Sequence, residues 1–428
     1  MFKIYILIVS KLSNYIIINS IVLLLSNYKT KTNEVNELKK YTILFFLIMF
    51  VIGTDTFLIS PLLPTLREMY GISTSTSGWL VSAYALGYFL FALISGPISD
   101  GLDKKKVLIW GFLAFGISTL LCGFATNFYL MLLFRFAAGV SASFAGPQIW
   151  ASIPVIIPKK DIVKVMGYTS AALSVSQLIG VPIGSYLAAI SWKTPFFVIS
   201  AASLILVLIT QFVMPSINNG ETFKEKPSFS SIYSEAFKNR RALSYLVAYF
   251  TFQTGNFCVL NFIGSWFTKS FALSLSGIGT AMIAIGIGNL IGTTFGSKLI
   301  NKIGISKSLL LGLYVLLGIY IVLPFADSLN LAVLGLTLVM LTNGFIFPIF
   351  MTTLQSTTTT ARSTISSLAN AAMYAGSSLG GIIGGIVISK FTGFFGIAYF
   401  TVVMYVITLF IYNKSGIFNK QAQVKESA

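Results

Sequence analysis

Two ionisable residues stand apart in this sequence because they lie deep inside long apolar stretches. Asp55 lies in VIGTDTFLIS, whereas the other eleven of the twelve acidic residues fall in polar connections or tails. Among the basic residues after position 40, Arg135 is likewise the one that lies deep in a long apolar stretch. A charge in an apolar environment is costly, so such residues usually face a partner or a cavity. Asp55 and Arg135 are therefore the first candidates for chemistry.

The chemistry that this pair could perform is proton transfer linked to a change of shape. An acid removed from water can take up and release a proton near neutral pH, and a nearby cation opposes that uptake. A pair that forms and breaks could couple the two events. The alternative is a static structural ion pair, or an acid at a helix end.

Other kinds of chemistry find little support. The sequence has no histidine, which removes histidine bases, histidine metal ligands and histidine proton relays. Cys122 and Cys258 both lie in apolar stretches, and we expect buried small hydrophobes rather than a disulfide or a metal pair. The sequence therefore predicts no cofactor and no metal.

The elements that carry Asp55 and Arg135 are predicted to be membrane-spanning helices. The 428 residues are 55% hydrophobic and only 10% charged, against about 25% charged in a soluble domain. Apolar runs long enough to cross a bilayer recur along the chain. We predict an all-α membrane protein with twelve spans, at 41–63, 77–99, 107–126, 129–156, 165–190, 195–214, 243–267, 276–299, 308–325, 331–355, 365–389 and 396–412.

One long polar connection divides these spans into six and six. The other connections are short, so successive helices are expected to be antiparallel neighbours. The predicted organisation is a peripheral or adventitious extension at 1–40, a six-helix bundle at 41–214, a central loop at 215–242, a second six-helix bundle at 243–412 and a tail at 413–428. The apolar stretch within 1–28 is broken by Lys11, Asn14 and Asn19, and a thirteenth span is the alternative for it.

The distribution of lysine and arginine predicts the orientation. Connections on the side of the central loop hold 15 of them, and those on the opposite side hold four, Arg67, Lys193, Lys269 and Lys390. Lysine and arginine are enriched on the cytoplasmic side of membrane proteins. The central loop and both ends of the twelve-span core are therefore predicted to be cytoplasmic. The net charge of +17 follows from this bias and does not indicate nucleic-acid binding.

The two six-span halves resemble each other at an offset of 201 residues. The offset superposes residues at equivalent positions in the spans: Asp55 on Asn256, Asp100 on Asn301, Gly180 on Gly381, and Gly184 on Gly385. Parallel repeats of this kind are a known transporter architecture. Because asparagine cannot carry a proton, proton handling would belong to the first half. The sequence predicts two pseudo-symmetric six-helix bundles.

A short charged connection, GPISDGLDKKK, carries a family resemblance. Gly96-x-x-x-Asp100 followed by three lysines resembles the loop 2–3 signature of the major facilitator superfamily, although Gly101 and Asp103 replace a basic residue and a glycine. The second half keeps Lys302, Gly304 and Lys307, with Asn301 in the aspartate position.

Two further motifs are similar to those of the same family. Arg135-x-x-x-Gly139 lies in the fourth predicted span, where the family has R-x-x-x-G. GVPIG, with Gly180, Pro182 and Gly184, resembles the antiporter motif of the fifth span, and SWKTPFF follows it. The resemblance covers about residues 41–412 and points to the drug:proton antiporter and sugar-efflux branch.

The resemblance implies roles for these motifs. Asp100 would contact the start of the eleventh span in one conformation only and act as a gate with Gly96, Asn301, Lys302 and Gly304; the alternative is a solvated turn. Glycines let helices approach closely, so Gly180, Gly184, Gly381 and Gly385 would pack the two halves together. Polar residues within spans are candidates for a substrate cavity: Gln177, Gln253, Asn256, Asn343, Asn370 and Tyr374.

The function implied is secondary active transport in the cell membrane by a monomer. Its partners would be protons, the lipid bilayer and a small neutral, amphipathic or monocationic solute, such as a drug-like compound or a sugar. Proton-coupled export by alternating access is favoured over uptake symport or facilitated diffusion. A membrane-embedded enzyme is the remote alternative, because it would need a nucleophile with a base or a metal cluster. ATP-driven transport is not indicated, because no phosphate-binding loop occurs.

The topology can be tested by cysteine labelling from outside the cell. A membrane-impermeant maleimide should react with Lys193→Cys or Lys269→Cys, which lie in the lysine-poor connections. It should not react with Lys105→Cys or Ile232→Cys until the cells are permeabilised. Labelling of Ile232→Cys in intact cells would overturn the predicted orientation.

Overall fold

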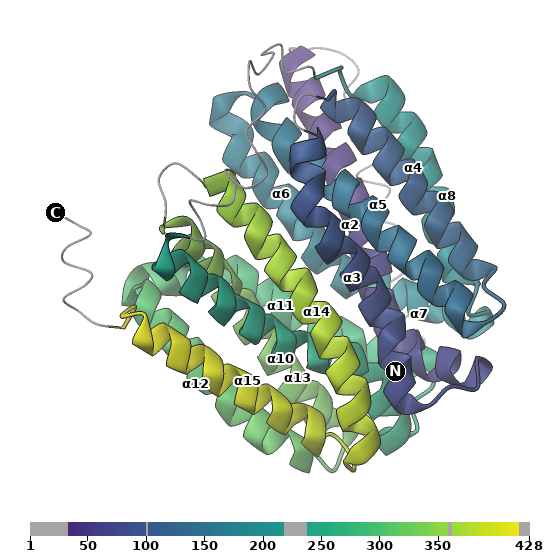
Figure 1. Ribbon diagram of the computed structural model, residues 1–428, viewed down its shortest axis with the longest axis vertical. Helices are drawn as coiled ribbons and strands as arrows, with labels where there is room; N and C mark the ends of the chain where they lie inside the picture. Colours follow the sequence, from purple (N-terminus) through teal and green to yellow (C-terminus); the bar gives the residue numbers. More distant parts are fainter. Residues whose placement is uncertain (1–32, 100–101, 218–237, 358–361, 419–428) are drawn as a thin grey trace. The chain divides into compact units, whose positions relative to one another are not determined.

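The structure is a computed structural model. It describes residues 33–99, 102–217, 238–357 and 362–418, and the chain is helical through nearly all of them. No strand occurs in these ranges. The elements are α2 (Asn33–Met69), α3 (Thr74–Ser99), α4 (Lys104–Gly123), α5 (Phe128–Ile156), η1 (Lys159–Asp161), α6 (Ile162–Val175), the π-helical turn η2 (Ser176–Gly180), α7 (Val181–Ile190), α8 (Thr194–Val213), α10 (Arg240–Phe271), α11 (Leu275–Ile303), α12 (Ile305–Val322), η3 (Leu323–Phe325), α13 (Leu329–Gln355), α14 (Arg362–Lys390) and α15 (Phe395–Lys414) (Figure 1).

Twelve helical segments in the described part of the chain are long and apolar enough to cross a membrane. The fifth of them, Lys164–Ile190, runs continuously through α6, η2 and α7. The predicted all-α fold with twelve spans is confirmed. The described residues from Leu44 onward form one compact unit. The division into two bundles at the central loop stays a prediction, and residues 1–32 and 218–237 lie outside the described ranges.

The first span is longer than the sequence pattern indicated. It was predicted at 41–63, but the spanning segment runs from Glu37 to Met69 and includes Pro61 and Pro64. Proline interrupts the hydrogen-bond ladder of a helix, but neighbouring helices in a bundle can satisfy the freed groups. The Ser60 carbonyl oxygen would lie 2.6 Å from a Cβ on Gly264 of the seventh span. The Ser60 side chain also bonds to that helix, because Ser60 Oγ donates a 2.5 Å hydrogen bond to the carbonyl oxygen of Leu260.

Helix starts coincide with side chains that can cap them. The side chains of Asn127, Asn239, Ser274 and Ser328 accept hydrogen bonds from backbone N–H groups in the first turns of α5, α10, α11 and α13. Such a cap contributes about 1 kcal/mol. Asn127, Ser274 and Ser328 each lie in a turn of a few residues between two spans, so the capped helix begins soon after the preceding one ends.

The first half meets the second half where α3 packs on α14 (Figure 1). Gly78 lies against the carbonyl oxygen of Gly381, and a Cβ on Gly385 would lie 2.5 Å from the carbonyl oxygen of Ser75. Ser82 Oγ donates a 2.7 Å hydrogen bond to the carbonyl oxygen of Ser378. The backbones approach so closely because neither helix carries a large side chain there, as expected for helices in hydrocarbon.

A second contact between the halves joins α7 to α11. A Cβ on Gly279 would lie 2.9 Å from the Ser185 side chain and 3.3 Å from the Pro182 carbonyl oxygen. The hydroxyl groups of Tyr186 and Thr280 share a 2.7 Å hydrogen bond. The repeat offset of 201 residues places Gly279 on Gly78, so the two contacts are related by the internal repeat.

The expectation for the four repeat-related glycines was half right. Gly381 and Gly385 do pack between the halves, against α3. Gly180 and Gly184 instead contact Thr54 and Leu58 of α2, within the first half. The fifth span approaches the second half through a different face of α7, where Pro182 and Ser185 lie against Gly279 of α11.

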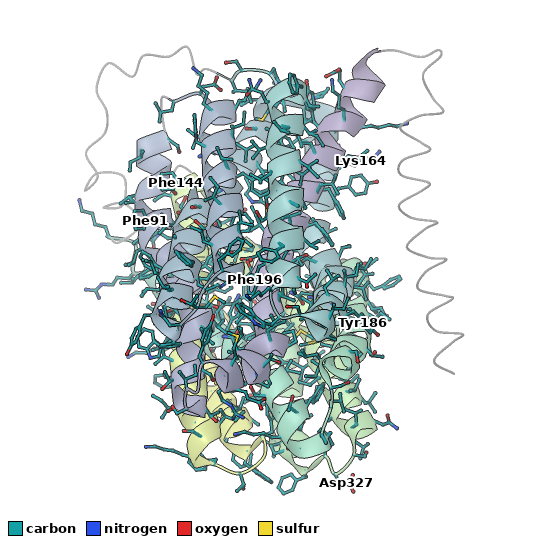
Figure 2. The ribbon with its side chains drawn as sticks, turned by 90° about the vertical axis from the view of Figure 1, so that its right-hand side faces the viewer. Phe91, Phe144, Lys164, Tyr186, Phe196 and Asp327 are labelled. Atoms are coloured by element: carbon teal, nitrogen blue, oxygen red, sulfur yellow. The ribbon has the colours of Figure 1, made fainter. Side chains whose placement is uncertain are left out.

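These contacts between halves gather toward one end of the helices, which we call the closed end. It is defined by the turns 70–73, 191–193, 272–274 and 391–394, and it is the predicted outer end. Asp327 lies at this end in Figure 2, and Lys164 lies toward the other. Large apolar side chains such as Tyr129 and Phe212, which is 85% exposed, cover the outward faces of the helices. That surface suits lipid rather than water.

Substitution of Gly78 should separate α3 from α14. The new methyl group of Gly78→Ala would collide with the carbonyl oxygen of Gly381, and overpacking of this kind costs about 1–3 kcal/mol. Thermal unfolding of the detergent-solubilised protein should therefore occur at a lower temperature than in the parent. Gly318→Ala is the matched control, because no atom lies within 4 Å of its Cβ position. Equal melting temperatures for the two variants would contradict the close approach.

Candidate functional site

Asp55 and Arg135 form a buried ion pair, as the sequence suggested. Arg135 Nη1 donates a 2.7 Å hydrogen bond to Asp55 Oδ2, and the Arg135 Nη2 group lies 3.5 Å from the Asp55 carbonyl oxygen. The two residues are 1% and 0% exposed. The pair joins α2 to α5, the first and fourth spans of the first half. It meets the requirement that a charge within a membrane has a partner.

A third helix, α3, also contacts the ion pair. Tyr84 of α3 places its ring 4.6 Å from Arg135 Cζ, in a cation–π contact. The Tyr84 hydroxyl lies 3.2 Å from Thr56 Oγ1 of α2. Cys122 lies fully buried on α4, which packs on α5. The helices α2, α3 and α5 therefore meet at this charge pair, and α4 packs against one of them.

One polar atom of each charged side chain has no hydrogen-bond partner among the described residues. These atoms are Asp55 Oδ1 and Arg135 Nε, and both are buried. A bidentate arginine–carboxylate contact would satisfy both and is the stronger geometry. The two charged groups therefore share one hydrogen bond, and Asp55 Oδ1 and Arg135 Nε remain available to another partner.

The antiporter-like motif packs directly on the segment that carries Asp55. A Cβ on Gly53 would lie 2.5 Å from Ser176 Oγ, Gly180 lies against the Thr54 side chain, and Gly184 lies against Leu58. Asp55 thus lies in a stretch of α2 that is held by the fifth span on both sides. The opposite face of the fifth span contacts α11, where a Cβ on Gly286 would lie 2.7 Å from Leu178 Cα. The motif connects the ion-pair helix to the second half.

The fifth span contains a feature that the sequence analysis missed. Residues Ser176–Gly180 form a π-helical turn between α6 and α7. Such turns are rare and often lie at functional sites. Pro182 lies just beyond it, at the start of α7, and its missing N–H group is the one local signal for an irregular ladder.

Three of the candidate cavity residues form one hydrogen-bonded chain in the second half. Asn343 Nδ2 donates to Asn256 Oδ1 at 2.8 Å, and Asn256 Nδ2 donates to Gln253 Oε1 at 3.1 Å. Gln253 Nε2 in turn donates to the Tyr249 hydroxyl at 2.8 Å. This chain joins α10 to α13, the first and fourth spans of the second half. It is the neutral counterpart of the Asp55–Arg135 contact.

The other candidate cavity residues lie elsewhere. Gln177 Oε1 accepts a 3.1 Å hydrogen bond from Asn289 Nδ2 of α11, so this polar contact crosses between the halves. Asn370 and Tyr374 lie one turn apart on α14, where Tyr374 is 9% exposed. The six candidates therefore form three groups rather than one. Their role in binding a substrate stays a prediction.

The predicted gate is described only in part. Gly96 lies near the end of α3, whereas Asp100 and the side chain of Asn301 lie outside the described residues. Lys302 is exposed in the last turn of α11, and Gly304 follows it with a φ of +86°. A residue with a side chain rarely adopts that φ, so the turn between α11 and α12 favours glycine. The gating role of these residues stays a prediction.

Asp103, which replaces the family's glycine, anchors two segments to each other. Its carboxylate accepts hydrogen bonds from the Lys105 N–H at 2.9 Å, the Ile217 N–H at 3.0 Å and the Ser216 hydroxyl. The Lys104 N–H also donates to the Ile217 carbonyl oxygen at 3.2 Å. Asp103 thus caps α4 and holds the chain that follows α8. The position of an aspartate just before a helix could have predicted the cap, but not the contact with residues 216 and 217.

These hydrogen bonds affect the proton affinity of Asp103. Partial burial alone would raise its pKa, but the hydrogen bonds from Ser216, Ile217 and Lys105 outweigh it and hold the pKa of Asp103 below its usual value. The anchor is therefore ionised at neutral pH.

Comparison with known proteins establishes the family. A sequence model described as Major Facilitator Superfamily matches residues 45–381. An uncharacterized MFS-type transporter of Bacillus subtilis strain 168, YceJ, is 49% identical over 369 residues, which are 86% of this chain and 94% of that protein. The chain belongs to the major facilitator superfamily, and it is a membrane transporter rather than an enzyme.

More distant relatives match part of the chain. Multidrug resistance protein 2 of Bacillus subtilis is 33% identical over 181 residues, or 42% of this chain and 45% of that protein. The quinolone resistance protein NorA of Staphylococcus aureus is 29% identical over 172 residues, or 40% of this chain and 44% of that protein. The chain therefore spans less than half the length of these two relatives.

Solved structures share the fold. A bacterial homologue of the human lysosomal transporter Spinster, in an inward-facing and unoccupied conformation, superposes with a TM-score of 0.71 at 17% identity, covering 92% of this chain and 99% of that one. A D-xylose–proton symporter gives a TM-score of 0.71 at 14% identity, covering 88% and 97%. These likenesses establish the major facilitator fold.

Loss of the Asp103 carboxylate should release the segment that follows α8. Asp103→Ala removes a helix cap worth about 1 kcal/mol and the contacts with Ser216 and Ile217. At neutral pH, hydrogen exchange at residues 216 and 217 should be faster than in the parent. Asp161→Ala is the control, because Asp161 caps no helix with its side chain.

The effect of Asp103→Ala should also depend on pH. A carboxylate with a lowered pKa stabilises the folded state above its unfolded pKa of about 3.9, and this contribution is lost as the pH falls through the lower folded pKa. The stability difference between parent and variant should therefore shrink in strong acid. Equal hydrogen exchange in Asp103→Ala and Asp161→Ala at neutral pH would contradict the anchor.

Proposed function

We propose that the protein is a proton-coupled exporter of a small solute that works by alternating access. The observation that carries this proposal is the buried Asp55–Arg135 pair, which lies where the antiporter-like motif packs on α2. Asp55 and Arg135 are the buried ion pair among the described residues, since the second salt bridge, Lys40–Glu37, is half exposed. The proton would be carried by Asp55, and Arg135 would oppose its uptake.

Protonation of Asp55 changes the charge balance of the whole site. The ionised pair is neutral overall, whereas a protonated Asp55 leaves the Arg135 charge buried without its anionic partner. Removal of one member of a buried pair typically costs about 3–5 kcal/mol. A conformational change that brings Arg135 another partner, or admits water, would offset this cost. Proton uptake would thus favour a second arrangement of α2, α3 and α5.

The direction of transport is supported by sequence likeness rather than by the fold. The antiporter-like Gly180, Pro182 and Gly184 favour exchange of a solute against protons. The matched relatives include proteins named for multidrug and quinolone resistance, which supports export. Uptake symport or facilitated diffusion is the alternative, because a D-xylose–proton symporter has the same fold.

The polar groups of the second half favour an uncharged or singly charged substrate. Tyr249, Gln253, Asn256 and Asn343 offer amide and hydroxyl groups without a formal charge. Asp55 could attract one positive charge when Arg135 moves away. We therefore propose a neutral, amphipathic or monocationic substrate, handled by a monomer in the cell membrane with the central loop and both ends of the core in the cytoplasm.

Replacement of the proposed proton carrier should separate proton movement from folding. Asp55→Asn should keep the protein folded, because it removes a buried charge and retains polarity. It should abolish transport driven by a pH gradient, while exchange of substrate without net proton movement survives. The measurement is substrate-driven proton flux in proteoliposomes, with the substrate chosen by accumulation of drugs, sugars and purines in expressing cells. Asp55→Glu should retain part of the flux.

Variants of the partner and of a distant acid complete the test. Arg135→Ala should lose coupling, whereas Arg135→Lys should keep part of it, because a cation remains at the site. Asp327→Asn is the control, since Asp327 is an exposed acid in the turn before α13. If Asp55→Asn transports with full proton coupling, another group carries the proton or the protein is a facilitator.

A further inference from the structure

Tyr84 stands between the ion pair and the contact of the two halves. One side of its ring receives the Arg135 guanidinium, whose Cζ is 4.6 Å from the ring centroid. Its ring also lies 6.4 Å from that of Tyr374, at an interplanar angle of 55°. Tyr84 belongs to α3 in the first half, and Tyr374 belongs to α14 in the second. Tyr84 therefore lies between the Arg135 charge and Tyr374 of the second half.

Tyr374 is held firmly by a second tyrosine of α3. Its ring stacks on that of Tyr88 with centroids 3.6 Å apart and an interplanar angle of 18°. Tyr84 and Tyr88 lie one helical turn apart, so both present their rings to the same side of α3. The three tyrosines are all buried. They form a continuous aromatic contact across the boundary between halves.

The aromatic contact continues into the close packing of α3 on α14. Ser378 follows Tyr374 by one turn and accepts the hydrogen bond from Ser82 at 2.7 Å. Gly381 and Gly385 then lie against Gly78 and Ser75 toward the closed end. The tyrosines therefore occupy the inner end of a seam between the halves, which we define as Tyr84, Tyr88, Ser82 and Gly78 of α3 with Tyr374, Ser378 and Gly381 of α14.

We propose that Tyr84 and Tyr374 are positioning residues that connect the state of the Asp55–Arg135 pair to the opening of the seam. This inference rests on the proposed proton coupling. When Asp55 is ionised, the carboxylate and the Tyr84 ring hold the guanidinium from two sides. When Asp55 is protonated, the Tyr84 ring becomes the main favourable contact left to the guanidinium. A shift of Arg135 would then move Tyr84 against Tyr374.

The charged and titratable groups at this site come from every helix packed around it. They are Asp55 of α2, Arg135 of α5, Tyr84 and Tyr88 of α3, Cys122 of α4, Tyr374 of α14 and Tyr249 of α10, which packs on α14. Among them, Asp55 is the group whose charge the proposal changes, and the tyrosine rings act through their faces and not through titration. Replacement of tyrosine by phenylalanine should therefore preserve the effect, whereas replacement by leucine should remove it.

The experiment follows seam opening with a cysteine at position 82. Ser82 is buried against α14, so Ser82→Cys should react with N-ethylmaleimide only when the seam opens. The reaction rate is compared on the two sides of neutral pH and divided by that of an exposed thiol, Ser389→Cys, which removes the intrinsic pH dependence of thiolate formation. Cys122 and Cys258 are fully buried, and the protein without Ser82→Cys gives their background.

The expected result is a several-fold change of the normalised rate with pH in Ser82→Cys, which disappears when Asp55→Asn is added. Tyr84→Leu should abolish most of the pH dependence, and Tyr84→Phe should keep it. Tyr374→Leu should raise the rate at both pH values, because the seam loses its inner contact, and Tyr374→Phe should resemble the parent. Tyr314→Leu, at a tyrosine that is 59% exposed on α12, is the matched control. Melting temperatures verify that each variant is folded.

The outcomes separate this inference from the proposed function. If the pH dependence requires Asp55 but persists in a folded Tyr84→Leu variant, the role of the tyrosines is wrong and proton coupling stands. If Ser82→Cys reacts at a pH-independent rate, and Asp55→Asn changes nothing, both proposals are overturned. A pH dependence that is lost equally in Tyr84→Phe and Tyr84→Leu would also contradict the proposal, because the ring face is intact in the phenylalanine variant.

Discussion

The ion pair between Asp55 and Arg135 is the interaction on which the first half of the protein depends. Hydrocarbon offers no solvent for an isolated charge, so each member fixes the position of the other and with it the helices α2 and α5. The Tyr84 ring covers the guanidinium from α3, and the antiporter-like motif holds α2 on both sides of Asp55. The pair nevertheless has only one short hydrogen bond between its charged groups, with Asp55 Oδ1 and Arg135 Nε unmatched. That geometry holds the helices together without locking them.

Contact between the halves does not depend on charge. It also receives no hydrophobic driving force, because lipid is as apolar as the helix surfaces. Close approach must come from small residues and from hydrogen bonds that the backbone can accept. Gly78 on Gly381, and Gly279 on Pro182, meet this need at sites related by the internal repeat. Serine hydroxyls add hydrogen bonds to carbonyl oxygens, from Ser82 to Ser378 and from Ser60 to Leu260. The proposed alternating access would require these contacts to separate and form again.

Sequence alone predicted the features that depend on residue type, namely the spans and the buried ion pair. The spans follow from apolar length, and the Asp55–Arg135 pair follows because each residue had no other charged partner within a span. It could not predict which face of a helix meets which neighbour, so Gly180 and Gly184 were assigned to the contact between halves instead of to α2. The π-helical turn at Ser176–Gly180 depends on packing rather than on local residue preference. The Asp103 anchor was missed because its partners lie more than one hundred residues away in the chain.

The internal repeat also shows where the two halves have diverged. In each half a polar contact joins the first span to the fourth, through Asp55 and Arg135 in one and through Asn256 and Asn343 in the other. The repeat offset carries Asp55 onto Asn256, whereas Asn343 lies seven residues beyond the position equivalent to Arg135. The same structural need is therefore met by a charged contact in the first half and by an amide contact in the second. An amide pair joins two helices without a group that titrates near neutral pH. In the proposed function, proton sensitivity would therefore belong to the first half, and the second half would recognise the solute by hydrogen bonds.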